Sequence, residues 1–112
     1  MQRFGMVTGL HTEHVDEYQR LHAAVWPDVL NCIARCNIRN YSIYFREIPG
    51  SGPMLFSYFE YSGSDFEADM ALMAEDEATQ KWWALCNPCQ RAVVEGEVGN
   101  TWVTMDDIFH QD

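Results

Sequence analysis

The order of the sequence patterns predicts an α+β fold, because a strand, a helix, two strands, a pair of helices and a last strand follow one another along the chain. This order is the split βαβ arrangement, so we expect a ferredoxin-like βαββαβ sandwich whose antiparallel sheet carries its helices on one face. A further observation is that residues 54–59 are apolar on both faces of the expected strand. The second face of the sheet therefore needs a cover as well, and we expect another subunit to supply it in a dimeric α/β barrel.

The first half of the chain predicts a strand and one long helix. Residues 3–10 are short and apolar, as expected of a strand. A helix should follow from a cap at Thr12 to about Cys36, because apolar residues recur there at helical spacing. Pro27 lies inside this segment and costs the helix a backbone hydrogen bond. Since the apolar pattern resumes at once, we expect a kink at Pro27 rather than a stop.

The middle of the chain predicts a hairpin. Residues 40–46 alternate as a strand should, with Tyr41, Ile43 and Phe45 on one face. Residues 48–53 are rich in Pro and Gly and predict a turn. Residues 54–61 form the second expected strand of the hairpin.

The last part of the chain predicts two helices, a loop and a final strand. We expect a helix cap within residues 62–65, a short helix at 66–74, and a second helix that starts near residue 77 and is stopped by Asn87-Pro88. Two glycines predict a loop at residues 95–100, and residues 101–109 are expected to form the last strand.

The length and the charge of the chain limit its function. Residues 1–112 are expected to form one domain, because no linker or repeat divides them and this length buries a sizeable core. Seven Lys and Arg stand against seventeen Asp and Glu, a formal charge of −10. This charge repels phosphate backbones and anionic lipids, so we expect neither nucleic acid nor a membrane as partner. No apolar run suits a membrane span or a secretion signal, and we expect a cytoplasmic protein.

The four cysteines form two pairs in the sequence, Cys32 with Cys36 and Cys86 with Cys89. Two such pairs can in principle build a tetrahedral zinc site. The first pair is poorly suited to it, because a rigid helix would fix both sulfurs on one of its faces. We favour reduced thiols in a cytoplasmic protein, some of them buried as small apolar residues.

The expected first helix carries an unusual apolar stripe. The stripe comprises Val15, Tyr18, His22, Val25, Trp26, Val29 and Ile33. Tyr18 and His22 are four residues apart, so a phenol and an imidazole should be neighbours on the inward face, where each polar tip needs a partner. Histidine exchanges protons near neutral pH, which makes His22 a candidate acid–base group. The other histidines, His11, His14 and His110, have no spacing that would join His22 in a metal site.

Aromatic residues elsewhere extend this candidate site. Trp82 and Trp83 are adjacent on a helix, so their side chains point about 100° apart; one can pack in the core while the other lines an opening. Tyr41 lies on the second strand. Aromatic walls with a few polar tips suit sugars, which present apolar C–H faces and many hydroxyls. The alternative is that all five residues, with Tyr18 and His22, are ordinary core or interface residues.

Three blocks of the sequence together resemble the L-rhamnose mutarotase family. They are residues 17–27 (Glu-Tyr-Gln-Arg-Leu-His-Ala-Ala-Val-Trp-Pro), 40–44 (Asn-Tyr-Ser-Ile-Tyr) and 80–83 (Gln-Lys-Trp-Trp), and they occur in the family's order with comparable spacing. The resemblance implies a ferredoxin-like homodimer that interconverts the α and β anomers of L-rhamnose and needs no metal or cofactor.

The resemblance also implies roles for the five candidate site residues. His22 matches the family's catalytic proton donor, and Tyr18, Tyr41, Trp82 and Trp83 match its sugar-binding positions. Opening the sugar ring requires an acid and a base, and the sequence does not identify the base. Two alternatives stay open: a mutarotase for another 6-deoxy sugar such as L-fucose, or a monooxygenase-like or non-catalytic dimeric α/β barrel that binds an aromatic metabolite.

Overall fold

An antiparallel sheet forms one layer of the computed structural model, which describes residues 1–94 and 101–112. Within these residues the strand order is β2-β3-β1-β4, and β5 also pairs with β1. The strands are β1 (Gln2–Leu10), β2 (Ile38–Ile48), β3 (Gly52–Tyr61), β4 (Gln90–Arg91) and β5 (Val103–Met105). The first strand lies inside the sheet and the hairpin strand β2 forms an edge, as expected for the βαββαβ order.

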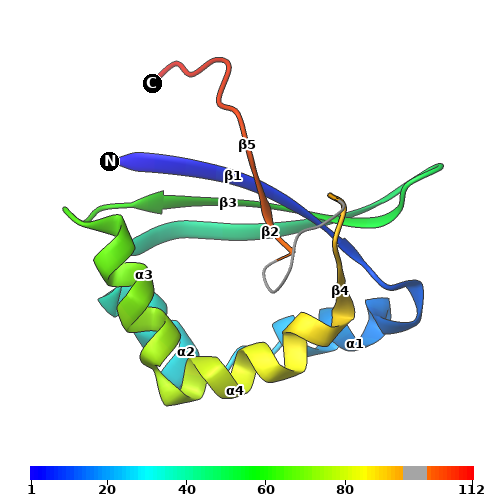
Figure 1. Ribbon diagram of the computed structural model, residues 1–112, viewed down its shortest axis with the longest axis horizontal. Helices are drawn as coiled ribbons and strands as arrows, with labels where there is room; N and C mark the ends of the chain where they lie inside the picture. Colours follow the sequence, from blue (N-terminus) through cyan, green and yellow to red (C-terminus); the bar gives the residue numbers. More distant parts are fainter. Residues whose placement is uncertain (95–100) are drawn as a thin grey trace.

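The helices lie together on one face of the sheet (Figure 1). They are α1 (Val15–His22), α2 (Pro27–Arg35), α3 (Phe66–Glu75) and α4 (Glu77–Cys86). Short 3₁₀ turns precede α1 (η1, Thr12–His14) and follow α4 (η2, Asn87–Cys89). The predicted α+β sandwich with helices on one face is confirmed. No helix of the described residues is long and apolar enough to cross a bilayer.

The prediction of one kinked helix from Thr12 to Cys36 was wrong. The chain leaves the helical conformation after His22, and a new helix begins at Pro27. Trp26 is extended (φ −63°, ψ 137°), the conformation that a following proline favours. Pro27 then occupies the first helical position, where its missing N–H costs nothing. Thr12 is not a side-chain cap either, because it lies inside the 3₁₀ turn.

The last strand is shorter than predicted. Residues 101–109 were expected to be extended, but only Val103–Met105 pair with β1. The short strand β4, which also pairs with β1, was not predicted. The predicted loop at 95–100 lies outside the described residues. The hairpin is confirmed, and its turn places Gly50 and Gly52 at positive φ, which glycine tolerates without strain.

The main core lies between β3 and the helices. Leu55 of β3 packs there with Leu10, Val29 and Trp82. The predicted apolar stripe still faces inward across the break between α1 and α2. Its members Tyr18 and Val29 are buried, and Val15, Val25, Trp26 and Ile33 pack against the same cluster. The break therefore changes the direction of the chain without exposing the stripe.

Candidate active site

Tyr18 and His22 stack on the inward face of α1. Their ring centroids are 4.1 Å apart and the ring planes differ by 24°. The Nδ1 atom of His22 lies 2.9 Å from the backbone carbonyl oxygen of Tyr18. A carbonyl oxygen can only accept a hydrogen bond, so Nδ1 carries the proton. In the neutral imidazole, Nε2 is then the atom with the free lone pair.

The surroundings of His22 favour this neutral form. Burial lowers the pKa of His22 below its ordinary value of 6.5, and the hydrogen bond to the Tyr18 carbonyl opposes this shift only in part. At neutral pH most His22 side chains are therefore uncharged. Such an imidazole accepts a proton at Nε2 first and donates it afterwards.

One tryptophan contacts His22, and a second packs against the first. Trp82 of α4 meets the imidazole edge-on at 5.2 Å between ring centroids, and Trp26 meets Trp82 in the same way, also at 5.2 Å. Trp82 is 6% exposed, and its neighbour Trp83 is half-buried against the same core cluster. The two adjacent indoles therefore differ in burial. Trp26 was not predicted to belong to the site, although its spacing of four residues from His22 was a signal for it.

Tyr41 reaches the site from the sheet. The register between β2 and β3 shifts between Arg39 and Ser42, and Asn40 has a positive φ of 49°, so a β-bulge sets the direction of Tyr41. Its ring packs edge-on against Phe59 at 5.6 Å. Tyr41 is 45% exposed, and partial burial raises its pKa. A side chain that is partly buried and partly accessible can line an opening.

A chain of polar side chains ends at Tyr18. The hydroxyl of buried Thr8 donates to Thr101 Oγ1 (2.8 Å), and the Thr101 hydroxyl donates to Gln90 Oε1 (2.9 Å). Burial raises the pKa of Tyr18, and the hydrogen bond that the Gln90 side chain donates to the phenol oxygen partly offsets this shift. The Tyr18 O–H then remains to donate to a ligand.

The structure brings most of the predicted site residues together. Tyr18, His22 and Trp82 are in direct ring contact, and Trp83 packs on the same cluster. Burial is the largest effect on the pKa of Tyr18, and the Gln90 hydrogen bond, which lowers it, is the second. Tyr41 is close enough to Tyr18 to raise this pKa further. No local sequence pattern indicated Gln90 or Thr8, because their partners are distant in the chain.

A separate surface hollow of about 680 Å³ lies between α2 and the start of α4. It contains none of the five predicted residues. Its lining mixes acidic and basic groups, among them Asp28, Arg35, Asp76 and Lys81. Its lining has no histidine, and the lowered pKa of Asp76 reflects its hydrogen bonds to Thr79 at the start of α4. The aromatic cluster around His22 remains the better candidate site.

The fold and the site define a class of protein: a small ferredoxin-like sandwich that presents one neutral imidazole among tyrosine hydroxyls and indole rings, an arrangement for acid–base chemistry on a small polar molecule. The chain belongs to the L-rhamnose mutarotase family, whose family model matches residues 3–111.

Individual members of the family match this chain over their full length. The chain is 31% identical to an L-rhamnose mutarotase of Lactiplantibacillus plantarum over 114 residues, and 28% identical to one of Oceanobacillus iheyensis over 112 residues, with 100% of each chain covered. A solved structure of an L-rhamnose mutarotase from Formosa agariphila superimposes with a TM-score of 0.74 at 18% identity and covers 100% of both chains. That structural likeness confirms the fold.

Proposed function

We propose that this protein is a mutarotase that interconverts the α and β anomers of L-rhamnose, with His22 as the proton-transfer group. The observation that carries the proposal is the imidazole of His22, whose Nδ1 is tied to the Tyr18 carbonyl while burial keeps the ring neutral. The family and the names of the relatives supply the substrate.

The proposed reaction uses one imidazole in two roles. Nε2 of neutral His22 takes the proton of the anomeric hydroxyl, the bond between the anomeric carbon and the ring oxygen breaks, and the imidazolium returns the proton to the ring oxygen. The aldehyde carbon turns, and the reverse steps close the ring from the other face. The proton lost by one oxygen is gained by the other, so no external base is required. The hydrogen bond from Nδ1 to the helix backbone becomes stronger in the imidazolium and stabilises it.

The remaining predicted residues bind the sugar in this proposal. Tyr18, whose oxygen is engaged by Gln90, donates its O–H to one sugar hydroxyl, and Tyr41 holds a second. Trp82 and Trp83 pack against the sugar ring and its C6 methyl group. A 6-deoxy sugar has this methyl group in place of a hydroxymethyl group, and an apolar wall favours it because no polar group is left unpaired.

The same proposal includes the assembly and the compartment. We propose a homodimer, because a row of apolar side chains crosses the face of the sheet that the helices leave uncovered. We propose a cytoplasmic location, because all four cysteines are free and buried, as suits a reducing compartment.

The first experiment is anomer exchange followed by NMR saturation transfer between the α and β anomeric protons of L-rhamnose. We expect fast exchange with the protein, and a decrease of roughly 10²–10⁴-fold in His22→Ala, the usual contribution of a positioned proton-transfer group. His110→Ala is the matched control, because His110 is exposed near the chain end. L-Fucose and D-glucose, tested in parallel, decide the substrate. Acceleration with none of the three sugars would contradict the proposal and favour a binder of aromatic metabolites.

A further inference from the structure

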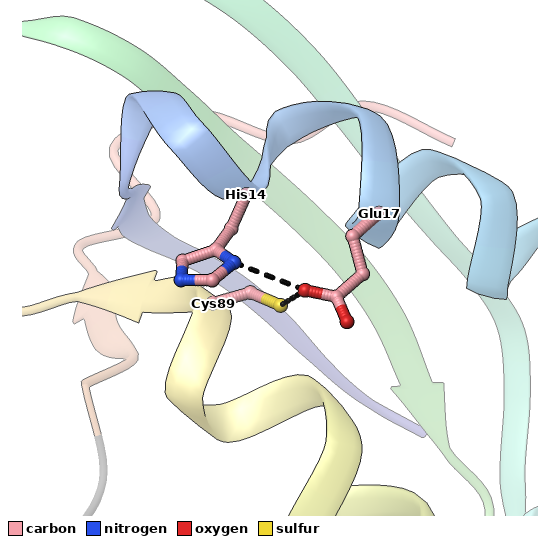
Figure 2. A group of neighbouring side chains, drawn as sticks. All are labelled: His14, Glu17 and Cys89. Atoms are coloured by element: carbon pink, nitrogen blue, oxygen red, sulfur yellow. Dashed lines mark hydrogen bonds and ion pairs between the residues drawn. The ribbon is translucent and has the colours of Figure 1, made fainter.

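Three potential metal ligands that the proposed reaction does not use converge beside α1. His14 lies at the end of η1, Glu17 one turn later on α1, and Cys89 at the end of η2 (Figure 2). Glu17 Oε1 is 3.0 Å from His14 Nδ1 and 3.4 Å from Cys89 Sγ, and one ligand atom from each of the three residues lies within 4.8 Å of the others. The side chains point toward one another, although Glu17 and Cys89 are 72 residues apart in the chain.

Two of the three ligand separations are close to those expected around a small tetrahedral ion. Ligand atoms about 2.0–2.3 Å from a common zinc ion lie roughly 3.3–3.8 Å apart in tetrahedral geometry. The two contacts of Glu17, at 3.0 and 3.4 Å, come within a few tenths of an ångström of this range. Imidazole nitrogen, carboxylate oxygen and thiolate sulfur are the three kinds of donor that zinc takes from proteins.

The backbone around the cluster is already fixed. The N–H of His11 donates to the Cys89 carbonyl oxygen at 2.9 Å, which ties η1 to η2. His14 and Glu17 are three residues apart and share one helix face. His11, whose ring lies 6.2 Å from the His14 ring, is not part of the cluster, so a water molecule would supply the fourth ligand. Cys86, which packs in the core, is not part of the cluster.

We propose that His14, Glu17 and Cys89 form a zinc site that fastens α1 to the turn after α4. Without metal, burial and the neighbouring Glu17 raise the pKa of Cys89 to about 11, so its S–H is retained and donates to Glu17. Zinc binding replaces this proton: the S–H bond breaks, a Zn–S bond forms, and the proton leaves to solvent. The Cys89 side chain is 1% exposed, so the ion would be held over a buried sulfur by the two more accessible ligands.

The position of the site gives it a structural role next to the sugar site. Glu17 precedes Tyr18 in the chain, and Cys89 precedes Gln90, so the ion would join the two segments whose side chains meet in the Tyr18–Gln90 hydrogen bond. The inference does not depend on the proposed reaction, since metal binding is measured without any sugar.

The test is titration of tag-free, metal-free protein with Co²⁺, followed by competition with Zn²⁺. Co²⁺ in place of zinc gives visible bands when tetrahedral and a near-ultraviolet charge-transfer band for each bound thiolate. We expect one equivalent with a single-thiolate band, and an increase in melting temperature with Zn²⁺ because the ion binds the folded state. Cys89→Ser should lose the thiolate band. His14→Ala should lose at least about tenfold in affinity, since even the outer partners of metal ligands are worth about 10–100-fold.

Matched controls separate this site from the other thiols and carboxylates. Glu13→Gln removes a carboxylate one residue before His14, and Cys86→Ser removes the neighbouring thiol; both variants should bind as the unaltered protein does. His14→Ala keeps the test valid if Cys89→Ser fails to fold, because His14 is only partly buried. Unchanged affinity in His14→Ala, a two-thiolate band, or loss of binding in Cys86→Ser would overturn the proposal.

Discussion

At the scale of single residues, one hydrogen bond determines what His22 can do. The Tyr18 carbonyl fixes the proton on Nδ1, and burial lowers the pKa of the ring. A histidine with an ordinary pKa would be partly protonated near neutral pH. In this site the resting imidazole is mainly neutral, which favours the exchange of roles over a resting imidazolium as the donor. The tyrosines of the site have raised pKa values, so they stay protonated as hydrogen-bond donors.

The pH dependence of anomer exchange follows from this lowered pKa. The neutral form of His22 dominates above a pKa that lies below 6.5. We therefore expect the catalysed exchange rate at low sugar concentration, with the protein-free rate subtracted at each pH, to rise with increasing pH through this pKa and to be level through neutral pH. Saturation transfer between about pH 4.5 and 8 measures this pH dependence. The range extends about two units below the ordinary histidine pKa of about 6.5.

Two further results would test whether His22 causes that pH profile. Residual activity in His22→Ala should lack the acidic inflection, because the titrating group is gone. A catalysed rate that decreases as the pH rises from 5 to 7, around the ordinary histidine pKa of about 6.5, would instead mean that the imidazolium is the working form.

Residues close in the chain were predictable from sequence, and those that meet across the fold were not. The stacking of Tyr18 on His22 follows from their spacing of four on a helix. Gln90 and Cys89 meet α1 only because η2 folds back beside η1, and neither residue belongs to a local pattern that predicts this contact. Sequence reasoning therefore predicted the contact of Tyr18 with His22, and missed the polar chain to Thr8 and the cluster at His14.

At the scale of elements, the break between α1 and α2 shows a limit of pattern reasoning. Helical periodicity continues across residues 23–26 because both helices bury the same stripe, and a periodic pattern cannot report that the helix ends in a turn and that Trp26 is extended. The rule that a proline begins a helix more readily than it continues one would have decided the question. The short β4 was missed because two residues form no recognisable alternation.

The position of α4, which carries Trp82 and Trp83, depends on a cap at Asp76. The Asp76 carboxylate accepts hydrogen bonds from the Thr79 N–H (3.0 Å) and hydroxyl (2.8 Å), and it pairs with Arg35 of α2 at 3.2 Å. We expect Asp76→Ala to lower the free energy of unfolding by about 0.5–2 kcal/mol, the usual cost of losing a helix N-cap. Urea denaturation at a fixed protein concentration measures this change.

The variant Asp76→Ser separates the cap from the ion pair. Serine retains an oxygen that caps the helix but loses the charge opposite Arg35, whose side chain is largely exposed. Since exposed ion pairs contribute little, Asp76→Ser should recover most of the stability that Asp76→Ala loses. Equal destabilisation in both variants would show that the charge, and not the cap, holds α4.

At the scale of the whole molecule, the topology was predictable because the order of strands and helices allows few arrangements. A strand–helix–strand–strand–helix–strand chain with short connections places the first strand inside the sheet, as the pairing of β1 with β3, β4 and β5 shows. The length of β5 was not predictable, because a strand's extent depends on the partner it pairs with, and among the described residues only Val103–Met105 of the segment 101–109 pair with β1. The apolar residues Ile108 and Phe109 are exposed there.

The uncovered face of the sheet is the basis for predicting a dimer. Tyr44, Phe56, Val7 and Val103 lie directly opposite one another on four strands. Phe56 alternates with Leu55, which packs toward the helices, so this row faces away from them. Tyr44 is 63% exposed in the single chain. An apolar row of this length on an open sheet face is best covered by a second copy of the chain.

We therefore expect sedimentation velocity to show a dimer for the unaltered protein and a monomer for Tyr44→Glu, because dimerisation would bury an unpaired carboxylate. Tyr44 is so exposed that its replacement should not unfold the chain, which circular dichroism checks. Leu72→Glu is the matched control: Leu72 is exposed on α3, in the opposite layer, and a charge there should leave the dimer intact. If Leu72→Glu separates the subunits and Tyr44→Glu does not, the helical layer is the interface. In that case the open sheet face must have another partner, since its apolar row would still need cover.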